Sequence, residues 1–399
     1  LSCRINDSKP YFYFMSDKKG IAILGATGSI GKKALEIIAA YPSYFDLQVI
    51  TANTNADLLI QLALLHKPNT VVIVDENQYK KVSEALWNED IHVYAGKDAL
   101  CQVVESGEIH TVLTAIVGFS GLESTIAAIR AKKQIALANK ESLVAAGELV
   151  TRLAKEYGVN IYPVASEHSA IFQCLSGEFK NRIEKIYLTT AGGPFRGFSG
   201  PQLKNVTRQA ALASSKFVLD PKLAIDSATF MNKGFEAIEA KWLFNLKPKQ
   251  IEVVVHQQSI VHGIVQFEDG SMKAQMGLSD MRLPIQFSLT YPDRFQTDFP
   301  RFNFMDHPEF SFEKADLEVF KNLNLAFSVI EKGGTAACVL NAANDVFVHA
   351  FLNEKISFVD IAHFNEAVVK AHSVILKPGY EDYVNADLWA RDYASNLIK

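Results

Sequence analysis

Residues 23–31, Ile-Leu-Gly-Ala-Thr-Gly-Ser-Ile-Gly, constrain the fold of this chain more than any other segment. They place Gly25, Gly28 and Gly31 directly after the apolar run 21–24 and at the start of a helical pattern. Glycines let the backbone turn tightly and approach a pyrophosphate, and the start of a helix supplies free N–H groups. This variant of the dinucleotide fingerprint predicts a cofactor site, and a glycine-rich turn that serves packing alone is the alternative.

Short apolar runs alternate with amphipathic segments from residue 20 to about residue 164. The runs cover residues 21–24, 47–51, 71–74, 111–117, 134–138 and 160–164. Strands that alternate with helices are typical of a parallel, doubly wound sheet. We therefore predict an α/β fold in which residues 18–164 form a Rossmann-like dinucleotide-binding domain.

The second half of the chain has a different pattern. Strands are predicted at 182–193, 251–256, 260–271 and 273–277, and Asp269-Gly270 predicts a hairpin turn. Residues 197–224 are irregular, which is typical of a lid or binding loop. We predict a central α+β catalytic domain over residues 165–294, with this lid at about 197–224.

The two ends of the chain are predicted to lie outside these domains. Residues 295–314 are rich in Phe and Pro and are predicted to be a linker, and residues 315–399 have helical spacing and predict a C-terminal bundle. The pair Gly333-Gly334 predicts a helix stop. Residues 1–17 are predicted to be an extension, because Met15 begins a natural start; a transit-peptide remnant is the alternative.

Composition excludes several classes of function. The 399 residues carry a net charge of −4, from 40 basic and 44 acidic side chains, which argues against nucleic acid as the main partner. The four cysteines are far apart and include no CxxC pair, so they predict neither a zinc site nor a disulfide framework, and they favour a reducing compartment. No apolar run reaches the roughly 18–20 residues of a membrane span, so no membrane partner is predicted.

Polar residues gather where predicted strands end and helices begin. They are Asn139, Lys140 and Glu141; Ser166, Glu167 and His168; Asp226, Ser227, Asn232, Lys233 and Glu236; and His256, Gln258, Ser259 and His262. A hydroxyl, an amide and an ammonium, from Ser227, Asn232 and Lys233, can hold a phosphate. Glu167 and Glu236 offer hard oxygen ligands to Mg²⁺ or Mn²⁺.

Each of these assignments has a structural alternative. Glu236 has the spacing of a solvated helix position, and His256 that of a core histidine. His262 and the pair Asp280 and Arg282 are interpreted as structural, the pair as a buried ion pair. At the end of the second strand, residues 51–55 contain no acid for a ribose 2′-hydroxyl, which favours NADP over NAD.

Six segments in combination resemble the 1-deoxy-D-xylulose 5-phosphate reductoisomerase family, over about residues 18–389. They are GATGSIG (25–31), ALANKESLV (136–144), SEHSAIFQCL (166–175), GGPFR (192–196), DSATFMNKGFEAIEAKWLF (226–244) and CVLNAANDVF (338–347). The resemblance implies an NADPH- and divalent-metal-dependent enzyme of the non-mevalonate isoprenoid pathway. Such an enzyme rearranges a phosphorylated sugar and reduces it to 2-C-methyl-D-erythritol 4-phosphate. It also implies a homodimer in the bacterial cytoplasm, with the plastid stroma as the alternative.

The resemblance also implies roles for individual residues, carried over by matching motif. Residues at the NADPH phosphates would be Gly25, Thr27, Gly28, Ser29 and Ile30. Residues elsewhere along the cofactor would be Asn53, Thr54 and Asn55 near the adenosine, and Asn139 and Glu141 near the nicotinamide. Substrate contacts would come from Lys140, Ser166, Ser214, Ser227, Asn232 and Lys233. Mg²⁺ or Mn²⁺ would be ligated by Glu167 and Glu236, and the catalytic residues would be Lys140 and Glu167.

The sequence departs from the family pattern at three substrate or metal positions. Ala165 stands where the family has a metal-binding Asp, Ala191 where it has a Ser, and Ser214 where the lid has a phosphate-binding His. One hypothesis is a working reductoisomerase with weakened metal use. A second is a family member that keeps NADPH binding but has lost turnover, and a third is another NADP oxidoreductase on this scaffold.

Overall fold

The first sheet of the protein is parallel and contains the glycine-rich loop. The computed structural model describes residues 18–178, 180–213 and 220–398, so the predicted extension 1–17 and Ser214 lie outside the described residues. Within those ranges seven strands pair in the order β4-β3-β2-β1-β5-β6-β7. Their bounds are β1 Lys19–Leu24, β2 Phe45–Ala52, β3 Thr70–Ile73, β4 His92–Ala95, β5 Thr111–Thr114, β6 Gln134–Leu137 and β7 Ile161–Pro163. The predicted α/β fold is confirmed. The strand β4 was not predicted, because alternate residues of this edge strand are exposed.

Helices cover both faces of this sheet, because successive side chains of a strand point to opposite faces. Ile21 and Ile23 of β1 face one hydrophobic core, while Ala22 and Leu24 face the other. The helices of the first core are α1 Ser29–Ala40, α2 Ala56–His66, α3 Tyr79–Ala85 and α12 Arg282–Thr290. Those of the second core are α4 Lys97–Val103, α5 Gly121–Arg130 and α6 Lys140–Tyr157.

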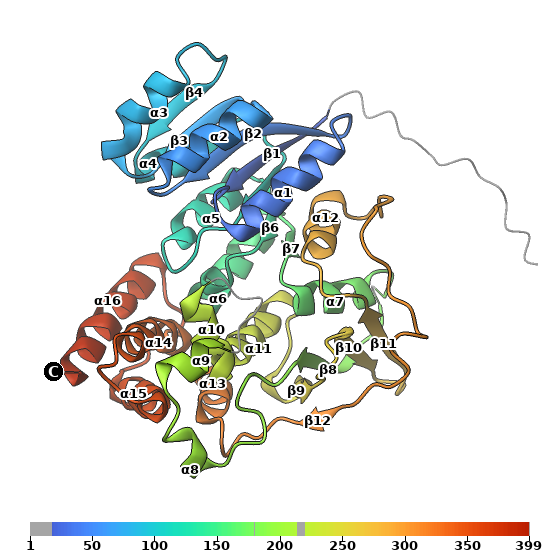
Figure 1. Ribbon diagram of the computed structural model, residues 1–399, viewed down its shortest axis with the longest axis vertical. Coiled ribbons are helices and arrows are strands. Elements are labelled where there is room, and N and C mark those ends of the chain that lie inside the picture. The colour runs from blue at the N-terminus through green and yellow to red at the C-terminus, as the bar shows by residue number, and fades with distance from the viewer. Residues whose placement is uncertain (1–17, 179, 214–219, 399) are drawn as a thin grey trace, which may run out of the picture.

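The helix α12 packs on the first sheet although it follows the second sheet in the chain. Its Ile285 and Leu289 belong to the same buried cluster as Ile21 and Ile23. The Lys19 ammonium of β1 donates to the Leu289 carbonyl over 2.7 Å, and Figure 1 shows α12 beside α1 and β7. The predicted domain boundaries at residues 164 and 294 therefore assign α12 to the second domain by sequence, although this helix packs on the sheet of the first domain.

The second sheet pairs its strands in the order β11-β10-β8-β9-β12. Their bounds are β8 Ile183–Thr190, β9 Ile251–Val255, β10 Val261–Phe267, β11 Met272–Met276 and β12 Glu313–Lys314. The predicted turn at Asp269-Gly270 joins the antiparallel pair β10 and β11, and Gly270 has a φ of +83°. The predicted linker 295–314 is wrong at its end, because β12 pairs with β9 and extends the sheet.

The predicted lid segment contains more regular structure than its sequence indicates. The helices there are α8 Gly200–Leu203, α9 Arg208–Ala213 and α10 Pro221–Ala228, so the prediction of an irregular stretch is wrong for these residues. The start of α10 is encoded locally, because Pro221 suits the first helical turn and the Asp220 side chain accepts from the Lys222 amide over 2.9 Å. A lid function for this segment stays a prediction.

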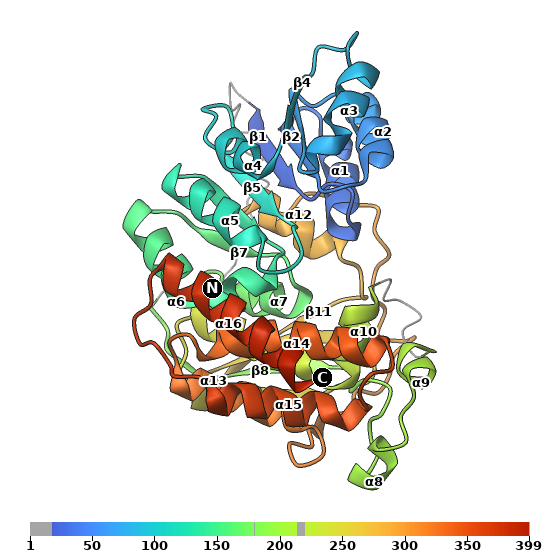
Figure 2. The same cartoon turned by 90° about the vertical axis from the view of Figure 1, so that its left-hand side faces the viewer.

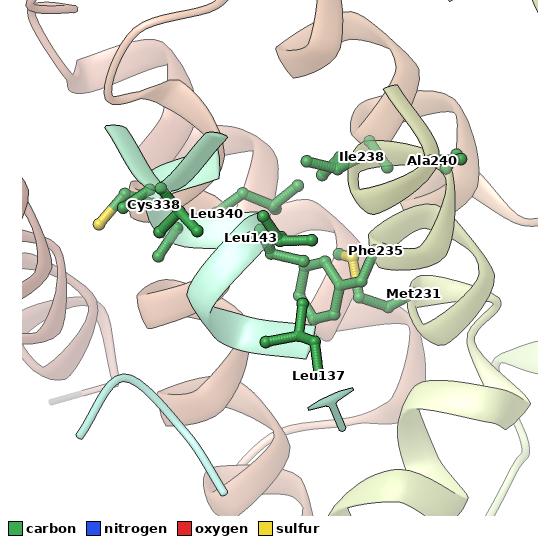
Figure 3. Packing of buried hydrophobic residues seen from close by; sticks show 14 of the residues in the cluster. Leu137, Leu143, Met231, Phe235, Ile238, Ala240, Cys338 and Leu340 are labelled. Carbon is green, nitrogen blue, oxygen red and sulfur yellow. The ribbon is translucent and has the colours of Figure 1, made fainter. Parts of the chain in front are cut away.

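The remaining helices join the two halves of the molecule around one core. Their bounds are α7 Ser166–Leu175, α11 Met231–Leu243, α13 Lys321–Lys332, α14 Ala336–Leu352, α15 Phe358–Ala371 and α16 Tyr380–Leu397, and short 3₁₀ turns lie at Glu76–Gln78 and Pro248–Gln250. The predicted helix stop is present, since α13 ends at Lys332 and Gly333 has a φ of +69°. Figure 2 shows α13 to α16 stacked together, and Figure 3 shows Leu143 of α6, Phe235 of α11 and Leu340 of α14 meeting in the core. None of the helices in the described part of the chain is both long and apolar enough to cross a membrane.

Candidate functional site

The glycine-rich loop lies at the carboxyl edge of the first sheet, between β1 and β5. The strand order reverses there, which is where open α/β sheets bind ligands. Gly25 has a φ of +93°, and a Cβ on it would lie 2.5 Å from the Ala115 carbonyl oxygen. A Cβ on Gly31 would lie 2.4 Å from the Gly25 carbonyl oxygen, so both glycines are needed for the loop to fit against its neighbours. The helix α1 then begins at Ser29 and directs its first amides toward the loop.

The three residues predicted near the adenosine follow β2 and are exposed. Asn53 and Thr54 lie in the turn after the strand, and Asn55 is the N-cap of α2. The Asn55 side chain accepts from the Leu58 amide over 3.1 Å. The structure therefore leaves this end of the sheet accessible to a ligand.

Asn139, predicted to contact the nicotinamide, has a structural role in this chain. It is 2% exposed, and its side-chain oxygen accepts from the Ser142 amide over 2.7 Å and caps α6. Its amide nitrogen donates to the carbonyls of Ile116 and Gly118, the latter over 3.0 Å. Asn139 thus anchors the loop after β5, and Glu141 is also nearly buried, at 9% exposed.

A polar cluster connects the starts of α6, α7 and α11. We call it the ammonium–carboxylate cluster, and its members are Lys140, Ser166, Glu167, Asn232, Lys233 and Glu236. The positions 232, 233 and 236 share one side of α11 because side chains three and four residues apart on a helix are neighbours. The predicted substrate and metal residues from three separate segments are therefore brought together.

Lys233 is at the centre of this cluster. Its ammonium donates to Glu167 Oε1 over 2.7 Å and also to Glu236 Oε2. The Ser166 hydroxyl donates to Glu167 Oε2 over 2.5 Å. The side chains of Lys233 and Glu236 are only 5% and 4% exposed, so the alternative of a solvated Glu236 is wrong.

Lys140 is connected to the carboxylates of the cluster through the side-chain amide of Asn232. The Lys140 ammonium donates to Asn232 Oδ1 over 2.7 Å, and Asn232 Nδ2 donates to Glu236 Oε1 over 2.7 Å. Lys140 Nζ is also 3.8 Å from Glu236 Oε1, and its side chain is 21% exposed. Lys140 is therefore the more accessible of the two ammonium groups.

The charges in the cluster set the protonation of Glu167. Burial alone would raise the pKa of this carboxyl, but the Lys233 charge and the hydrogen bonds from Lys233 and Ser166 lower it to about 2. Burial likewise disfavours the charged form of Lys233, yet the two carboxylates raise its pKa above the ordinary value. Glu167 is therefore a carboxylate at neutral pH and Lys233 an ammonium.

Two further buried titratable side chains, His168 and Glu239, lie next to the cluster, and the sequence analysis missed Glu239. His168 Nε2 lies 2.8 Å from the Glu236 carbonyl oxygen, and His168 Nδ1 lies 3.7 Å from Glu239 Oε2. Burial lowers the pKa of His168 and raises the pKa of Glu239, which favours the uncharged form of both. The position of Glu239, three residues after Glu236 on α11, was the signal that could have identified it.

The three residues predicted to bind the substrate phosphate, Ser227, Asn232 and Lys233, come from two successive helices, α10 and α11. Asn232 and Lys233 direct hydrogen bonds to the carboxylates of the cluster, whereas Ser227 lies on α10 beside the loop of Gly193. The helix α10 is held from the C-terminal bundle, because Asn344 donates to Asp226 Oδ1 over 2.7 Å.

The two histidines at the ends of β9 and β10 contact backbone atoms through their rings, and both also line the cleft described below. His256 is fully buried, its Nδ1 is 2.9 Å from the Ser311 carbonyl oxygen, and its Nε2 accepts from the Ile260 amide. His262 Nε2 is 3.1 Å from the Gly277 carbonyl oxygen. The core alternative for His256 and the structural interpretation of His262 are therefore supported.

One cleft joins the glycine loop to the ammonium–carboxylate cluster. It has a volume of about 1230 Å³ and is lined by Ser29 of α1, Ser166 and Glu167 of α7, and Ala191 after β8. The pair Asp280 and Arg282 also lines it, with a 2.6 Å contact and side chains 21% and 35% exposed, so this ion pair is on the cleft wall and not buried as predicted. The cleft can therefore hold a ligand between the loop and the cluster.

The two acids predicted to ligate a divalent cation are engaged by donors of the protein in this structure. Each of the four carboxylate oxygens of Glu167 and Glu236 already has a donor within the protein. Ala165, directly before α7, contributes no oxygen ligand from its side chain. Across residues 18–178, 180–213 and 220–398, no group of three or more His, Cys, Asp or Glu side chains is arranged to hold a metal.

Comparisons with protein families and with curated proteins all give the same enzyme family. Residues 21–147 match the family model of 1-deoxy-D-xylulose 5-phosphate reductoisomerase, and residues 161–244 and 276–393 match two models of C-terminal domains of the same enzyme. The reductoisomerase of Bacteroides thetaiotaomicron is 51% identical over 381 residues, which are 96% of this chain and 98% of that protein. That of Ruminiclostridium cellulolyticum is 48% identical over 380 residues, 95% and 99% of the two chains.

Solved structures give the same result. The Zymomonas mobilis reductoisomerase in complex with NADPH superposes with a TM-score of 0.91 at 39% identity, covering 96% of this chain and all of that one. A reductoisomerase in complex with NADPH, fosmidomycin and magnesium superposes with a TM-score of 0.89 at 37% identity, covering 95% and 98% of the two chains.

Proposed function

Because this chain belongs to the 1-deoxy-D-xylulose 5-phosphate reductoisomerase family, we propose that it acts as an NADPH-dependent reductoisomerase of isoprenoid biosynthesis. The substrate is the phosphorylated sugar 1-deoxy-D-xylulose 5-phosphate, and the product is 2-C-methyl-D-erythritol 4-phosphate. The observation that carries the proposal is a cleft whose lining includes both Ser29 after the glycine loop and Glu167 of the cluster. The predicted homodimer and the bacterial cytoplasmic location remain predictions.

NADPH is the cofactor in this proposal. Its pyrophosphate would bind the amides at the start of α1, and the exposed residues after β2 would face its adenosine end. The turn after β2 carries no acid that would repel a 2′-phosphate. Two related enzymes have been solved with NADPH, which supports the same choice here.

The cluster supports the reduction step through its positive charges. NADPH, when bound, would supply the hydride that reduces the carbonyl carbon of the rearranged aldehyde, and the carbonyl oxygen, which gains the C=O π electrons, would take a proton to become an alcohol. Lys140, whose ammonium is partly exposed, is the proposed proton donor. Glu167, with a pKa of about 2, stays ionised and orients Lys233. The two ammonium groups stabilise the oxyanion as it forms.

A second candidate function is favoured by one observation in the cluster. A family member that binds NADPH without turnover would be expected if the rearrangement needs a divalent cation, because the acids of this cluster are engaged by Lys233. Ala165, Ala191 and the predicted lid position Ser214 support the same alternative.

Oxidation of NADPH in the presence of 1-deoxy-D-xylulose 5-phosphate distinguishes the active reductoisomerase from the family member that binds NADPH without turnover. The wild-type chain and the Ala165→Asp variant would be assayed with a chelator and with increasing Mg²⁺ or Mn²⁺. Turnover by the wild-type chain supports the reductoisomerase. No turnover at any metal concentration, together with recovery in Ala165→Asp, would establish the second candidate. NADPH and NADH titrations on the same samples test cofactor choice, and a higher affinity for NADH would refute the NADPH assignment.

A further inference from the structure

Each carboxylate oxygen of Glu167 and Glu236 already accepts a hydrogen bond from the protein itself. Glu167 accepts from Lys233 and Ser166, and Glu236 accepts from Lys233 and Asn232. Buried carboxylates normally require such partners, because an uncompensated charge in a protein interior is very unfavourable. A divalent cation at this place would have to displace the Lys233 ammonium from both acids.

Counting formal charges leads to the same conclusion. The two carboxylates contribute −2, and the ammonium groups of Lys140 and Lys233 contribute +2, so these four side chains are neutral as a set. The affinity of a hard-oxygen site for Mg²⁺ or Mn²⁺ depends on the negative charge of its ligands. A neutral set offers little attraction to a divalent ion.

We propose that the Lys233 ammonium is the resident cation of this site, bridging Glu167 and Glu236 where a divalent ion would otherwise be bound. The inference deepens the proposed function, and its relevance to catalysis rests on that function. It predicts that the cluster is complete without metal. The positive charge of the cluster comes from Lys140 and Lys233.

Binding of Mn²⁺ measured by electron paramagnetic resonance, with isothermal titration on the same samples, tests the proposal without needing turnover. The wild-type chain is expected to show only weak binding of Mn²⁺. Lys233→Gln keeps a polar side chain but removes the ammonium, which leaves the buried Glu236 and the partly buried Glu167 without their shared cation. This variant is expected to bind one Mn²⁺ at least about tenfold more tightly than the wild-type chain.

Two further variants make the result interpretable. Ala165→Asp adds an acid beside the cluster and is expected to raise Mn²⁺ affinity by about tenfold or more, so it decides the question if Lys233→Gln does not fold. Lys185→Gln is the matched control. Lys185 pairs with Glu252 over 2.7 Å on the second sheet, and its loss should leave Mn²⁺ binding unchanged.

The proposal is overturned if the wild-type chain binds one Mn²⁺ as tightly as Ala165→Asp, or if a folded Lys233→Gln binds it no better than the wild-type chain. Melting temperatures give an independent readout, because a ligand that binds the folded state stabilises it. Mn²⁺ should raise the melting temperature of Lys233→Gln and not that of Lys185→Gln. Failure of the NADPH oxidation assay would refute the proposed function and leave these binding results unaffected.

Discussion

Adding a single methyl group to Gly31 tests whether the glycine loop and α1 form the cofactor site. The new Cβ would lie 2.4 Å from the Gly25 carbonyl oxygen and 2.5 Å from Ala26 Cα, where ordinary contact requires 3.4 Å or more. Both neighbours are backbone atoms, so the start of α1 must move by roughly 1 Å, and such overpacking costs about 1–3 kcal/mol. Because about 1.4 kcal/mol is a factor of ten in affinity, a cost of this size in the loop geometry that binds NADPH should raise the NADPH dissociation constant of Gly31→Ala about fivefold to 150-fold.

Gly28 provides the comparison within the same loop. Its φ is −75°, and a Cβ there would lie 3.4 Å from the Gly25 carbonyl oxygen, so Gly28→Ala should fold without strain. The new methyl would stand at the N-cap of α1, where the pyrophosphate is expected, and should weaken NADPH binding without lowering the melting temperature. Gly107→Ala is the distant control, because nothing lies within 4 Å of its Cβ position.

The assays are NADPH titration by fluorescence and thermal unfolding by circular dichroism. Gly31→Ala should bind NADPH more weakly and melt at a lower temperature. Gly28→Ala should only bind NADPH more weakly, and Gly107→Ala should change neither property. A Gly31→Ala variant that binds NADPH and melts like the wild-type chain would refute the reasoning, because the close approach of α1 to β1 would then not support the cofactor site.

Three further changes test the packing around the site. Burial lowers the pKa of Lys19 to about 8, so between about pH 8 and pH 10.5 the unfolded chain binds more protons than the folded one, and the free energy of unfolding rises with pH. Lys19→Met should remove this rise, as measured by denaturant titration at several pH values. An equal rise in both proteins would contradict the reasoning. Asn344→Ala removes the 2.7 Å donor to the buried Asp226 and should cost about 1–3 kcal/mol, seen as a lower melting temperature; an unchanged one would refute the anchoring of α10. In Gly147→Ala the Cβ would lie 2.1 Å from Trp242 Cδ1, so the indole must move, and overpacking should cost about 1–3 kcal/mol; an unshifted tryptophan emission spectrum would argue against this contact.

Local patterns in the sequence were sufficient for the cofactor half of the molecule. The glycines follow a strand and precede a helix, and the alternation of apolar runs with helices specifies a parallel sheet. The pairing of residues within the cluster could be predicted only in part. Spacing on α11 placed Lys233 and Glu236 on one side, but the contact of Lys233 with Glu167 depends on how α7 meets α11, which no local pattern encodes.

Other outcomes depended on tertiary contacts that leave no periodic signal. The side chain of Asn139, which is predicted to lie near the nicotinamide, anchors the loop after β5 and caps α6, and no local pattern indicates this contact with the loop. The strand β12 is two residues long and lies in a segment rich in Phe and Pro, so it could be recognised only from its partner β9.

The position of α12 has a consequence for how the protein is synthesised. The first sheet is complete in sequence at β7, but Ile285 and Leu289, which cover part of one face, are translated about 120 residues later. At ribosomal rates of about 5–20 residues per second, α12 is synthesised roughly 6–25 s after the sheet that it covers. The nascent sheet therefore exposes apolar surface during this interval, and a fragment that ends at residue 164 should be retained by chaperones.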